Sequence, residues 1–311
     1  MRKIVMTLKQ LRYVIKVAET GNITEAAKKL FIAQPSLTAA IRELENEYNI
    51  TIFTRSKKGI EITTEGDEFL GYARQVLEQA DLIEEKYTGV RHNKQRFCVS
   101  AQHYSFVVEA FVELLKEFGK DKYEFHIRET QTYDIIEDVA CLRSEIGILY
   151  RNDFNETVID KSLRDNGLEF HLLFKAKPHV FVGKNSPLGR KNFLTLDDLK
   201  AYPRLSYEQG SHNSFYFAEE ILSTIDSDKE IIVRDRATLF NLLIGLDGYT
   251  ICTGVISEEL NGPNIVAKPL KVEDYMEIGY IIPGHTPLSQ MTKNYIKMLE
   301  KSVSAQTSSK D

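Results

Sequence analysis

Apolar residues in the first fifty positions recur every three or four residues in three runs, which is the spacing of one helix face. The runs are Leu8, Leu11, Ile15 and Ala18; Ala26, Ala27 and Leu30; and Leu37, Ile41, Leu44 and Tyr48. Gly21 separates the first run from the second, and Asn22 can cap the second helix. Pro35 suits the first turn of the third helix. The pattern predicts three short helices that pack around a common core.

The third predicted helix carries a polar stripe opposite its apolar face. Gln34, Thr38 and Arg42 are spaced by four, and Ser36 lies beside them. An amide, a hydroxyl and a guanidinium are groups that read base edges in a major groove. Two helices joined by a tight turn, the second with polar side chains facing outward, are typical of a helix-turn-helix. An ordinary three-helix bundle with a solvated polar face has the same spacing and stays open as an alternative.

Two short alternating segments follow, Ile52–Arg55 and Ile60–Thr63, around the basic turn Ser56-Lys57-Lys58-Gly59. Alternation on both sides of a turn with glycine predicts a β-hairpin. With Lys57 and Lys58 at its tip, such a hairpin is a wing that can reach a phosphate backbone.

The next segment predicts one long helix, because it contains no proline between Glu65 and Arg91. Its apolar residues recur at alternating steps of four and three, as in a coiled-coil seam. They are Phe69, Ala73, Val76, Ala80, Ile83 and Tyr87. The seam favours pairing with a second copy of the chain. A long amphipathic helix lying on its own body is the alternative.

After residue 97, predicted strands alternate with predicted helices, which favours an α/β architecture with mainly parallel sheets. The strands are Phe97–Ala101, Tyr123–Arg128, Ile146–Tyr150, Phe170–Phe174, His179–Val182, Glu230–Val233, Tyr249–Cys252 and Glu277–Ile282. The helices are Phe106–Phe118, Tyr133–Leu142, Phe215–Leu222, Ala237–Ile244 and Leu288–Glu300. The polar residues from Ser302 to Asp311 predict an unstructured tail.

In sequential α/β sheets, ligands bind at the carboxyl ends of the strands, and polar residues follow several predicted strands here. They are Ser100, Gln102, His103, Tyr104 and Ser105; Tyr150; Ser206, Tyr207, Gln209, Ser211 and His212; and Thr253. Each group alone is also compatible with an ordinary polar loop. Together they predict a small-molecule site of aromatic, hydrogen-bonding character, and they do not identify its ligand.

Composition adds a division of charge and excludes several classes of protein. The 311 residues carry a net charge of −5, yet residues 1–64 hold eleven Lys/Arg and six Asp/Glu and are basic. A basic N-terminal segment joined to an acidic remainder favours a nucleic-acid-binding module joined to a domain of different function. The chain shows no apolar run long enough for a membrane span and no secretory signal, so a cytoplasmic protein is expected.

The chemistry-bearing residues do not favour an enzyme. Cys98, Cys141 and Cys252 lack metal-binding spacing, so small buried side chains are expected, with a redox-sensing pair as the alternative. The sequence has no P-loop, GxSxG, HExxH or GxGxxG motif, and its seven histidines are dispersed. No cofactor is expected. A metabolic enzyme or a solute-binding module with an accessory DNA-binding head remains the alternative function.

The segment from Leu8 to Gly66 resembles the DNA-binding domain of the LysR-type transcriptional regulators. Its landmarks AAKKL, AQPSLTAAIRELE, IFTR and TTEG occur in family order. Later stretches, LEFHLLFKAKPHVFV, SPLG, LTLDDLKAYPRLSY and GLDGYTICTGV, resemble the family's effector-binding domain. Ala33 stands where the family usually has serine, and Ala39 where it often has a long polar residue. Arg143-Ser144-Glu145 replaces a Gly and an Asp found in many members.

The resemblance implies a winged helix-turn-helix over residues 1–64, a dimerising linker helix over 65–91, an effector-binding domain over 92–305 and a tail over 306–311. The effector-binding domain would resemble periplasmic solute-binding proteins, with one lobe of about 97–170 plus 271–302 and a second of about 171–270. DNA contacts are implied for Gln34, Pro35, Ser36, Thr38, Arg42, Arg55, Lys57 and Lys58. Implied partners are double-stranded promoter DNA, RNA polymerase, a small-molecule effector, and copies of this chain in a homodimer or homotetramer.

Overall fold

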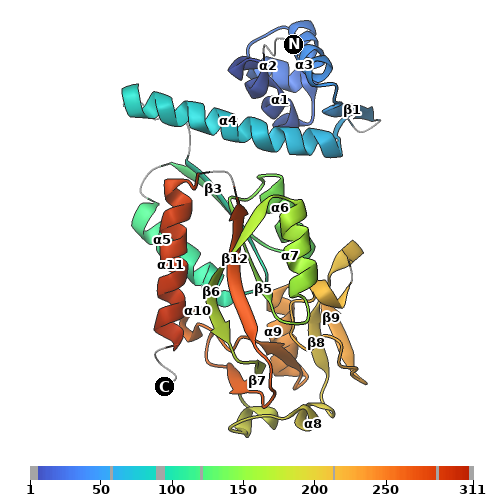
Figure 1. Ribbon diagram of the computed structural model, residues 1–311, viewed down its shortest axis with the longest axis vertical. Helices are drawn as coiled ribbons and strands as arrows, with labels where there is room; N and C mark the ends of the chain where they lie inside the picture. Colours follow the sequence, from blue (N-terminus) through green and yellow to red (C-terminus); the bar gives the residue numbers. More distant parts are fainter. Residues whose placement is uncertain are drawn as a thin grey trace. The chain divides into compact units, whose positions relative to one another are not determined.

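The structure is a computed structural model that describes residues 6–56, 59–88, 95–119, 122–212, 214–284 and 287–307. Its contacts divide the chain into two compact units (Figure 1). The first comprises Met1–Asn93 with Cys141–Arg143, and the second comprises Lys94–Ala140 with Ser144–Asp311. Each unit has its own hydrophobic core and is described by itself.

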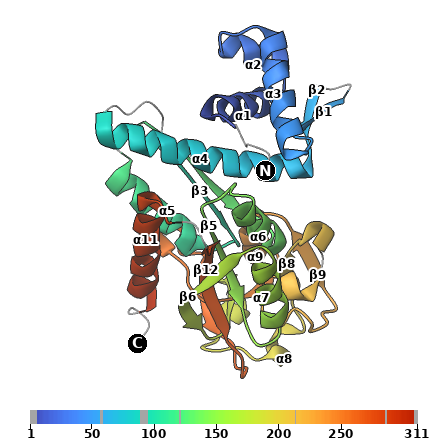
Figure 2. The ribbon, with the colours of Figure 1, turned by 45° about the horizontal axis from the view of Figure 1, so that its top comes forward.

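The first unit begins with three helices, α1 (Leu8–Thr20), α2 (Ile23–Lys29) and α3 (Gln34–Tyr48), as the sequence predicts (Figure 2). The Thr7 side chain caps α1 in a reciprocal box with Gln10, and the Asn22 side chain accepts from two backbone N–H groups at the start of α2. The expected apolar faces meet in one core that contains Leu11, Ala26, Leu37, Ile41 and Leu44. Three amphipathic helices therefore bury their stripes against each other.

The predicted wing is also present. Strand β1 (Phe53–Ser56) pairs antiparallel with β2 (Gly59–Ile62), with Phe53 opposite Ile62. Lys57 and Lys58, expected at its tip, lie outside the described residues. Helix α4 follows over Thr64–Thr88, and the expected end of the linker helix near residue 91 also lies outside them.

The second unit contains two five-stranded sheets. The first sheet has the order β4-β3-β5-β12-β6. Its strands are β3 (Gln95–Ala101), β4 (Tyr123–Glu129), β5 (Ile146–Arg151), β6 (Leu168–Ala176) and β12 (Met276–Pro283). The accompanying helices are α5 (Ser105–Phe118), α6 (Thr132–Ala140), α7 (Glu156–Asp165) and α11 (Gln290–Thr307). We call this sheet with its helices the first lobe; its strand β6 runs to Ala176, beyond the boundary expected near residue 170.

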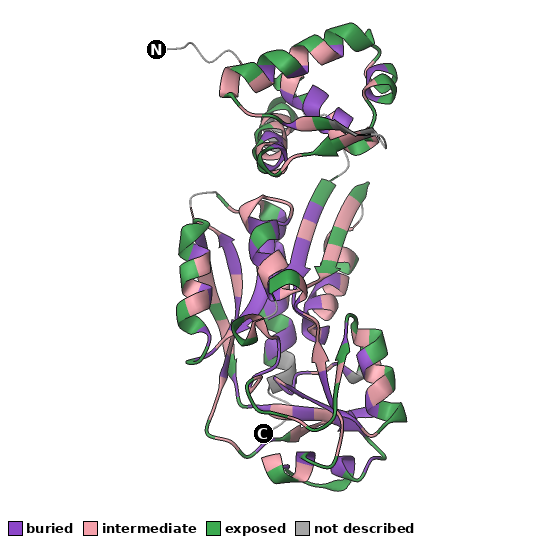
Figure 3. Ribbon diagram, turned by 90° about the vertical axis from the view of Figure 1, so that its right-hand side faces the viewer, coloured by how far each residue is buried: buried purple, intermediate pink, exposed green. Residues whose placement is uncertain are grey.

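Helices cover both faces of the first sheet, and its strands supply alternate residues to each face. Ile148 belongs to the core cluster under α5 and α11, whereas its neighbour Leu149 belongs to the cluster under α6 and α7. The same alternation separates Ile278 from Ile281 on β12. Buried strands between two helical layers are visible in Figure 3. When both faces of a sheet are covered, successive residues of its central strands are nearly all apolar.

The second sheet has the order β11-β7-β10-β8-β9 and forms the second lobe. Its strands are β7 (His179–Gly183), β8 (Arg204–Tyr207), β9 (Glu230–Val233), β10 (Tyr249–Cys252) and β11 (Ile265–Pro269). Its helices are α8 (Leu196–Leu199), α9 (Arg236–Gly245) and α10 (Glu258–Asn261), with short 3-10 turns at Leu188–Arg190, Gly210–His212 and Phe215–Phe217.

The expectation of mainly parallel sheets is wrong. In the first sheet β3 pairs parallel with β4 and β5, but β12 pairs antiparallel with β5 and β6. In the second, β7 is antiparallel to both of its neighbours, whereas β8 is parallel to β9 and β10. The returning strand β12 comes from far along the chain, and local spacing contains no information about its direction.

Two further expectations fail. The predicted helix Phe215–Leu222 is only a 3-10 turn over Phe215–Phe217, and Leu222 has a positive φ of 61°, which ends any helix there. The predicted unstructured tail is helical as far as Thr307, because Val303 is buried in the core of the first lobe. Over the described residues, every helix is too short or too polar to cross a lipid bilayer.

Candidate functional site

The first candidate site is the outward face of α3. Leu37, Ile41 and Leu44 are buried on its inner face. The polar stripe lies opposite: Gln34, Pro35, Ser36 and Arg42 are exposed, and Thr38 is half-buried. A helix held by one apolar face and free on the other can enter a groove without disturbing its core.

The start of α3 lacks a side-chain cap, as the alanine at position 33 predicts. Ala33 has an extended backbone and makes no capping hydrogen bond, and Pro35 lies in the first turn. The turn before it holds Phe31 with a positive φ of 56° and a side chain that is 94% exposed. The N-terminus of α3 thus has backbone N–H groups that no side chain caps, and these groups can donate to an anion such as a phosphate.

On the wing, the structure pairs the backbone of Arg55 with Ile60 across the hairpin. The side chain of Arg55, like Lys57 and Lys58, lies outside what the structure describes.

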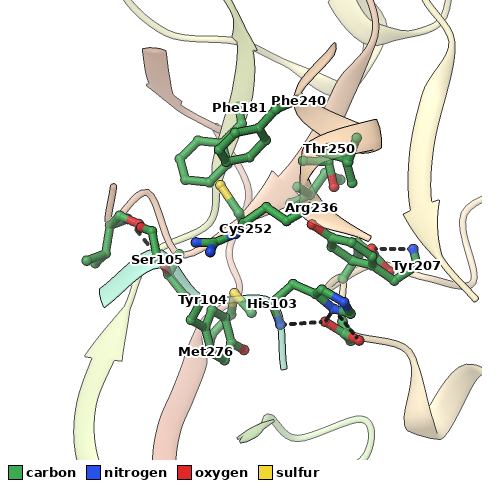
Figure 4. A pocket seen from close by; sticks show the side chains of 16 residues that line it. His103, Tyr104, Ser105, Phe181, Tyr207, Arg236, Phe240, Thr250, Cys252 and Met276 are labelled. Carbon is green, nitrogen blue, oxygen red and sulfur yellow. Dashed lines mark hydrogen bonds and ion pairs between the residues drawn. The ribbon is translucent and has the colours of Figure 1, made fainter. Parts of the chain in front are cut away.

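The second candidate site is a small pocket between the two lobes, with a cavity volume of about 40 Å³ (Figure 4). The turn after β3 supplies His103, Tyr104 and Ser105. The second lobe supplies aromatic, sulfur-containing and charged side chains. They are Phe181, Tyr207, Phe240, Cys252, Glu219, Glu220 and Arg236, and Thr250 and Thr253 add hydroxyl groups. Figure 4 shows Arg236 extending into the pocket below Phe181 and Phe240.

His103 and Glu219 join the two lobes at one end of the pocket. The backbone N–H of His103 donates to Oε2 of Glu219 at 3.0 Å, and Nδ1 of the imidazole lies 2.9 Å from the same oxygen. Both side chains are about 95% buried, since 5% and 4% of their surfaces are exposed. Burial alone would lower the pKa of His103, but the Glu219 carboxylate, by charge and hydrogen bond, raises it above its ordinary value. The pair is therefore a buried, charge-assisted contact.

Glu220 lies beside this pair and is itself buried. Its Oε1 accepts from the backbone N–H of Tyr207 at 2.9 Å. Burial and the neighbouring Glu219 carboxylate raise the pKa of Glu220 to about 8. The raised pKa favours the neutral form of the Glu220 carboxyl near neutral pH.

Arg236 is the cation of the pocket. It begins α9, and its guanidinium forms an ion pair with Oε1 of Glu129 at 3.0 Å. Glu129 ends β4 of the first lobe, so this pair also joins the lobes.

The residues predicted for the effector site fall into three groups. Those that line the pocket are His103, Tyr104, Ser105, Tyr207 and Thr253. Gln102, Tyr150 and Gln209 lie behind it in a buried network. Gln102 accepts from the Tyr104 hydroxyl and the Tyr150 N–H, and Gln209 accepts from the Thr132 N–H.

The third group lies elsewhere. Ser100 is fully buried and donates to Asp138 at 2.5 Å, because its side chain points into the first lobe. Ser206 donates to Glu230 between two strands. Ser211 is exposed, and His212 stacks on Tyr133 with ring centroids 3.5 Å apart. A position near a strand end does not settle on which side of the backbone a side chain lies.

Sequence reasoning missed the charged residues of the pocket. Glu219 and Glu220 fell within the wrongly predicted helix, and Arg236 lay one residue before a predicted helix. Two adjacent carboxylates within the otherwise largely apolar stretch Phe215–Leu222 were the available signal.

Profiles of two families match the chain. Residues 8–67 match the bacterial regulatory helix-turn-helix protein, lysR family, and residues 96–304 match the LysR substrate binding domain. Together these cover both units.

Curated relatives agree. The chain is 26% identical over 245 residues to the HTH-type transcriptional regulator AlsR of Bacillus subtilis, covering 78% of this chain and 77% of AlsR. It is 43% identical over 77 residues to the regulator ClcR of Pseudomonas putida, which is 25% of this chain and 26% of ClcR. These relatives are regulators, which favours a regulator over the enzyme considered from the sequence.

Solved structures share the fold. A full-length cysteine variant of OxyR from Pseudomonas aeruginosa aligns with a TM-score of 0.64 at 17% identity, covering 96% of this chain and 95% of OxyR. CbnR in complex with its target DNA aligns with a TM-score of 0.56 at 19% identity, covering 96% of this chain and all of CbnR. With both units matched by family profiles, the chain belongs to the LysR family of DNA-binding transcription regulators.

Proposed function

We propose that two copies of this chain place their α3 helices in successive major grooves of a dyad-symmetric promoter site, and that a small molecule in the interlobe pocket modulates this binding. The observation that carries the proposal is the division of α3 into a buried apolar face and an exposed face with Gln34, Ser36 and Arg42. That division satisfies the steric requirement for a recognition helix.

Each exposed side chain has a role that its chemistry supports. Gln34 can bond an adenine edge with its amide, and Arg42 can bind a guanine edge or a phosphate. Thr38 can offer a hydroxyl or a methyl group to the bases. Pro35 and Ser36 would approach the backbone beside the uncapped start of α3. Arg55, Lys57 and Lys58 on the wing would bind phosphates, which hold the register without reading sequence.

Helix α4 supports dimerisation. Tyr72, Val76, Ile83 and Tyr87 are all exposed, with Ile83 and Tyr87 61% and 77% exposed. Residues at these spacings share one face of a helix, and a run of apolar side chains on a helix surface favours a partner helix. Phe69 and Ala73, from the same predicted seam, instead pack in the core of the first unit. We therefore place the pairing surface on the later turns of α4.

Effector binding is proposed to act by population shift. A ligand that contacts both lobes favours the lobe arrangement in which those contacts form, and it changes DNA binding only as far as its affinity differs between arrangements. The family relationship supports two further steps: assembly of two dimers into a tetramer, and contact with RNA polymerase at a promoter. Both would take place in the cytoplasm with the chromosome.

The proposal can be tested with the full chain and a pool of random-sequence duplexes. Rounds of binding and amplification should enrich two inverted half-sites whose centres are separated by whole helical turns. Footprints on the enriched duplex should then change when a metabolite that stabilises the protein is added. A pool that shows no enrichment at low salt would contradict the DNA-binding proposal.

A further inference from the structure

The Glu219 carboxylate occupies the hydrogen-bonding groups that His103 of the first lobe presents at the pocket. Its Oε2 accepts from the His103 N–H and faces the imidazole Nδ1, just before the start of α5. Its Oε1 faces the Gln209 side-chain amide at 3.5 Å. Among the ion pairs of the described residues, this carboxylate is paired with His103. The first lobe thus offers a donor set that binds a carboxylate, and the chain's own side chain occupies it.

The rest of the pocket is also rich in donors. The Arg236 guanidinium and the hydroxyls of Ser105, Thr250 and Thr253 line it. Glu220 opposes an anion only weakly at neutral pH, because burial and Glu219 raise its pKa to about 8. Glu219 is therefore the charged group on the pocket wall that repels a second anion. Without the Glu219 charge, the donors would favour one.

Glu219 comes from a segment with little regular structure. Residues 208–229 connect β8 to β9, and the described ones contain only two 3-10 turns. This connection lies over the first lobe through ring contacts: His212 on Tyr133 at 3.5 Å, and Tyr216 on Phe154 at 4.8 Å. Tyr216 and Phe154 are both exposed at their outer edges. These ring contacts lie at the surface, whereas Gln209, Glu219, Glu220 and Ile221 are buried, so side chains rather than strand pairing hold the connection in place.

We infer that Glu219 is a built-in competitor in the interlobe pocket, and that the effector is a small carboxylate that displaces it from His103. This inference rests on the proposed effector role of the pocket. The group that His103 already binds with its N–H and its imidazole is a carboxylate, which favours a carboxylate over a tetrahedral phosphate. Displacement would break the contact between Glu219 and His103, which joins the two lobes, and so change how the lobes are held together.

The test is chemical rescue in the full chain. Glu219→Ala removes the competing group, and acetate is the probe because it is the smallest molecule with the lost carboxylate. Acetate should raise the melting temperature of Glu219→Ala in a saturable way and bind it at least about twofold more tightly than wild type, since a tethered competitor acts at an effective concentration near millimolar. Acetamide, with the same shape and no charge, should give no shift.

The matched control is Glu208→Ala, which lies in the same connection but is half-buried and paired with Arg234. It should show the wild-type response to acetate. If Glu219→Ala unfolds, Glu219→Gln keeps the side-chain size and an acceptor for the His103 N–H. In that variant the NMR-detected pKa of His103 should fall, because the charge that raises it is gone.

Three outcomes would overturn the inference: equal acetate binding by wild type and Glu219→Ala, an equal response to acetamide, or a stronger response to inorganic phosphate than to acetate. Duplex enrichment by the wild-type chain is measured separately. Retained enrichment together with failed rescue would leave the proposed function standing and reject only the role of Glu219.

Discussion

The imidazole of His103 lies flat against the phenol ring of Tyr207, with ring centroids 3.9 Å apart and planes inclined by 5°. His103 belongs to the first lobe and Tyr207 ends β8 of the second, so the stack joins the two lobes at the pocket. Burial raises the pKa of Tyr207 well above its ordinary value, and its ring is a neutral surface at physiological pH. The stack and the Glu219 carboxylate together fix the orientation of His103.

Tyr207→Leu should loosen this arrangement without removing a charge. The variant keeps apolar volume but loses the flat face, so we expect a loss of roughly 1 kcal/mol in unfolding free energy. Chemical denaturation of the full chain measures it. Tyr280→Leu, which removes a comparable stack on His171 away from the pocket, is the control. Only Tyr207→Leu should also alter the His103 titration.

Arg42→Ala should weaken binding to the enriched duplex by about 1–3 kcal/mol, or roughly five- to 150-fold, because a groove-facing guanidinium is lost. Fluorescence anisotropy at fixed salt measures the change. Arg12→Ala is the matched control: Arg12 is exposed and pairs with Asp81 at 3.1 Å. An equal loss from both variants would mean that Arg42 contributes only general charge.

Ile83→Asp should shift the chain from dimer to monomer. A charge in the middle of the exposed apolar stripe of α4 would be buried unpaired in a helix–helix contact, which costs several kcal/mol. Sedimentation velocity over a concentration series measures the shift. Thr88→Asp adds the same charge about 100° around the helix from Tyr87 and should leave the dimer intact. A dimeric Ile83→Asp protein would place the pairing surface elsewhere.

Glu220 should make the protein less stable as pH rises from about 4.5 to about 8. In the unfolded chain this carboxyl ionises near 4.5, whereas the native state keeps its proton until about 8. The native state therefore binds more protons across this window, and its stability falls as pH increases. Glu220→Gln should remove that slope and be more stable than wild type at the upper end, by on the order of a few kcal/mol.

Urea unfolding at a series of pH values within this window checks the prediction. The two proteins should agree at the acidic end, where the wild-type carboxyl is neutral in both states. A wild-type slope that survives in Glu220→Gln would assign the dependence to another group. His103 is the expected contributor, because its raised pKa also gives stability that is lost as pH increases.

Phe31→Asn should stabilise the first unit. Phe31 holds a left-handed backbone with its side chain almost wholly exposed, so little packing is lost and about 1 kcal/mol of strain is relieved. Asn49, which ends α3 with a φ of 55°, provides the reciprocal test: Asn49→Ala should destabilise by a similar amount. Melting curves of both variants measure the pair, and a lower melting temperature for Phe31→Asn would contradict the strain argument.

Much of the fold was predictable from local spacing. Helices α1 to α3, the β1–β2 hairpin and strands such as β3, β5 and β10 are all marked by periodicity within a few residues. The outward face of α3 followed from the same pattern, because burying Leu37 and Ile41 turns Gln34 and Arg42 away from the core. Features that depend on the chain's own short-range geometry are visible without a structure.

The pocket was decided by tertiary structure. His103 and Glu219 are separated by 116 residues, and no spacing rule brings them together. The segment from Phe215 to Leu222 has a helical pattern, yet contacts with the first lobe and the left-handed Leu222 prevail over its propensity. The direction of β12 is likewise set by the strands it meets. A local sequence pattern indicates which side chains prefer burial. Only the tertiary structure determines which of them line the same pocket.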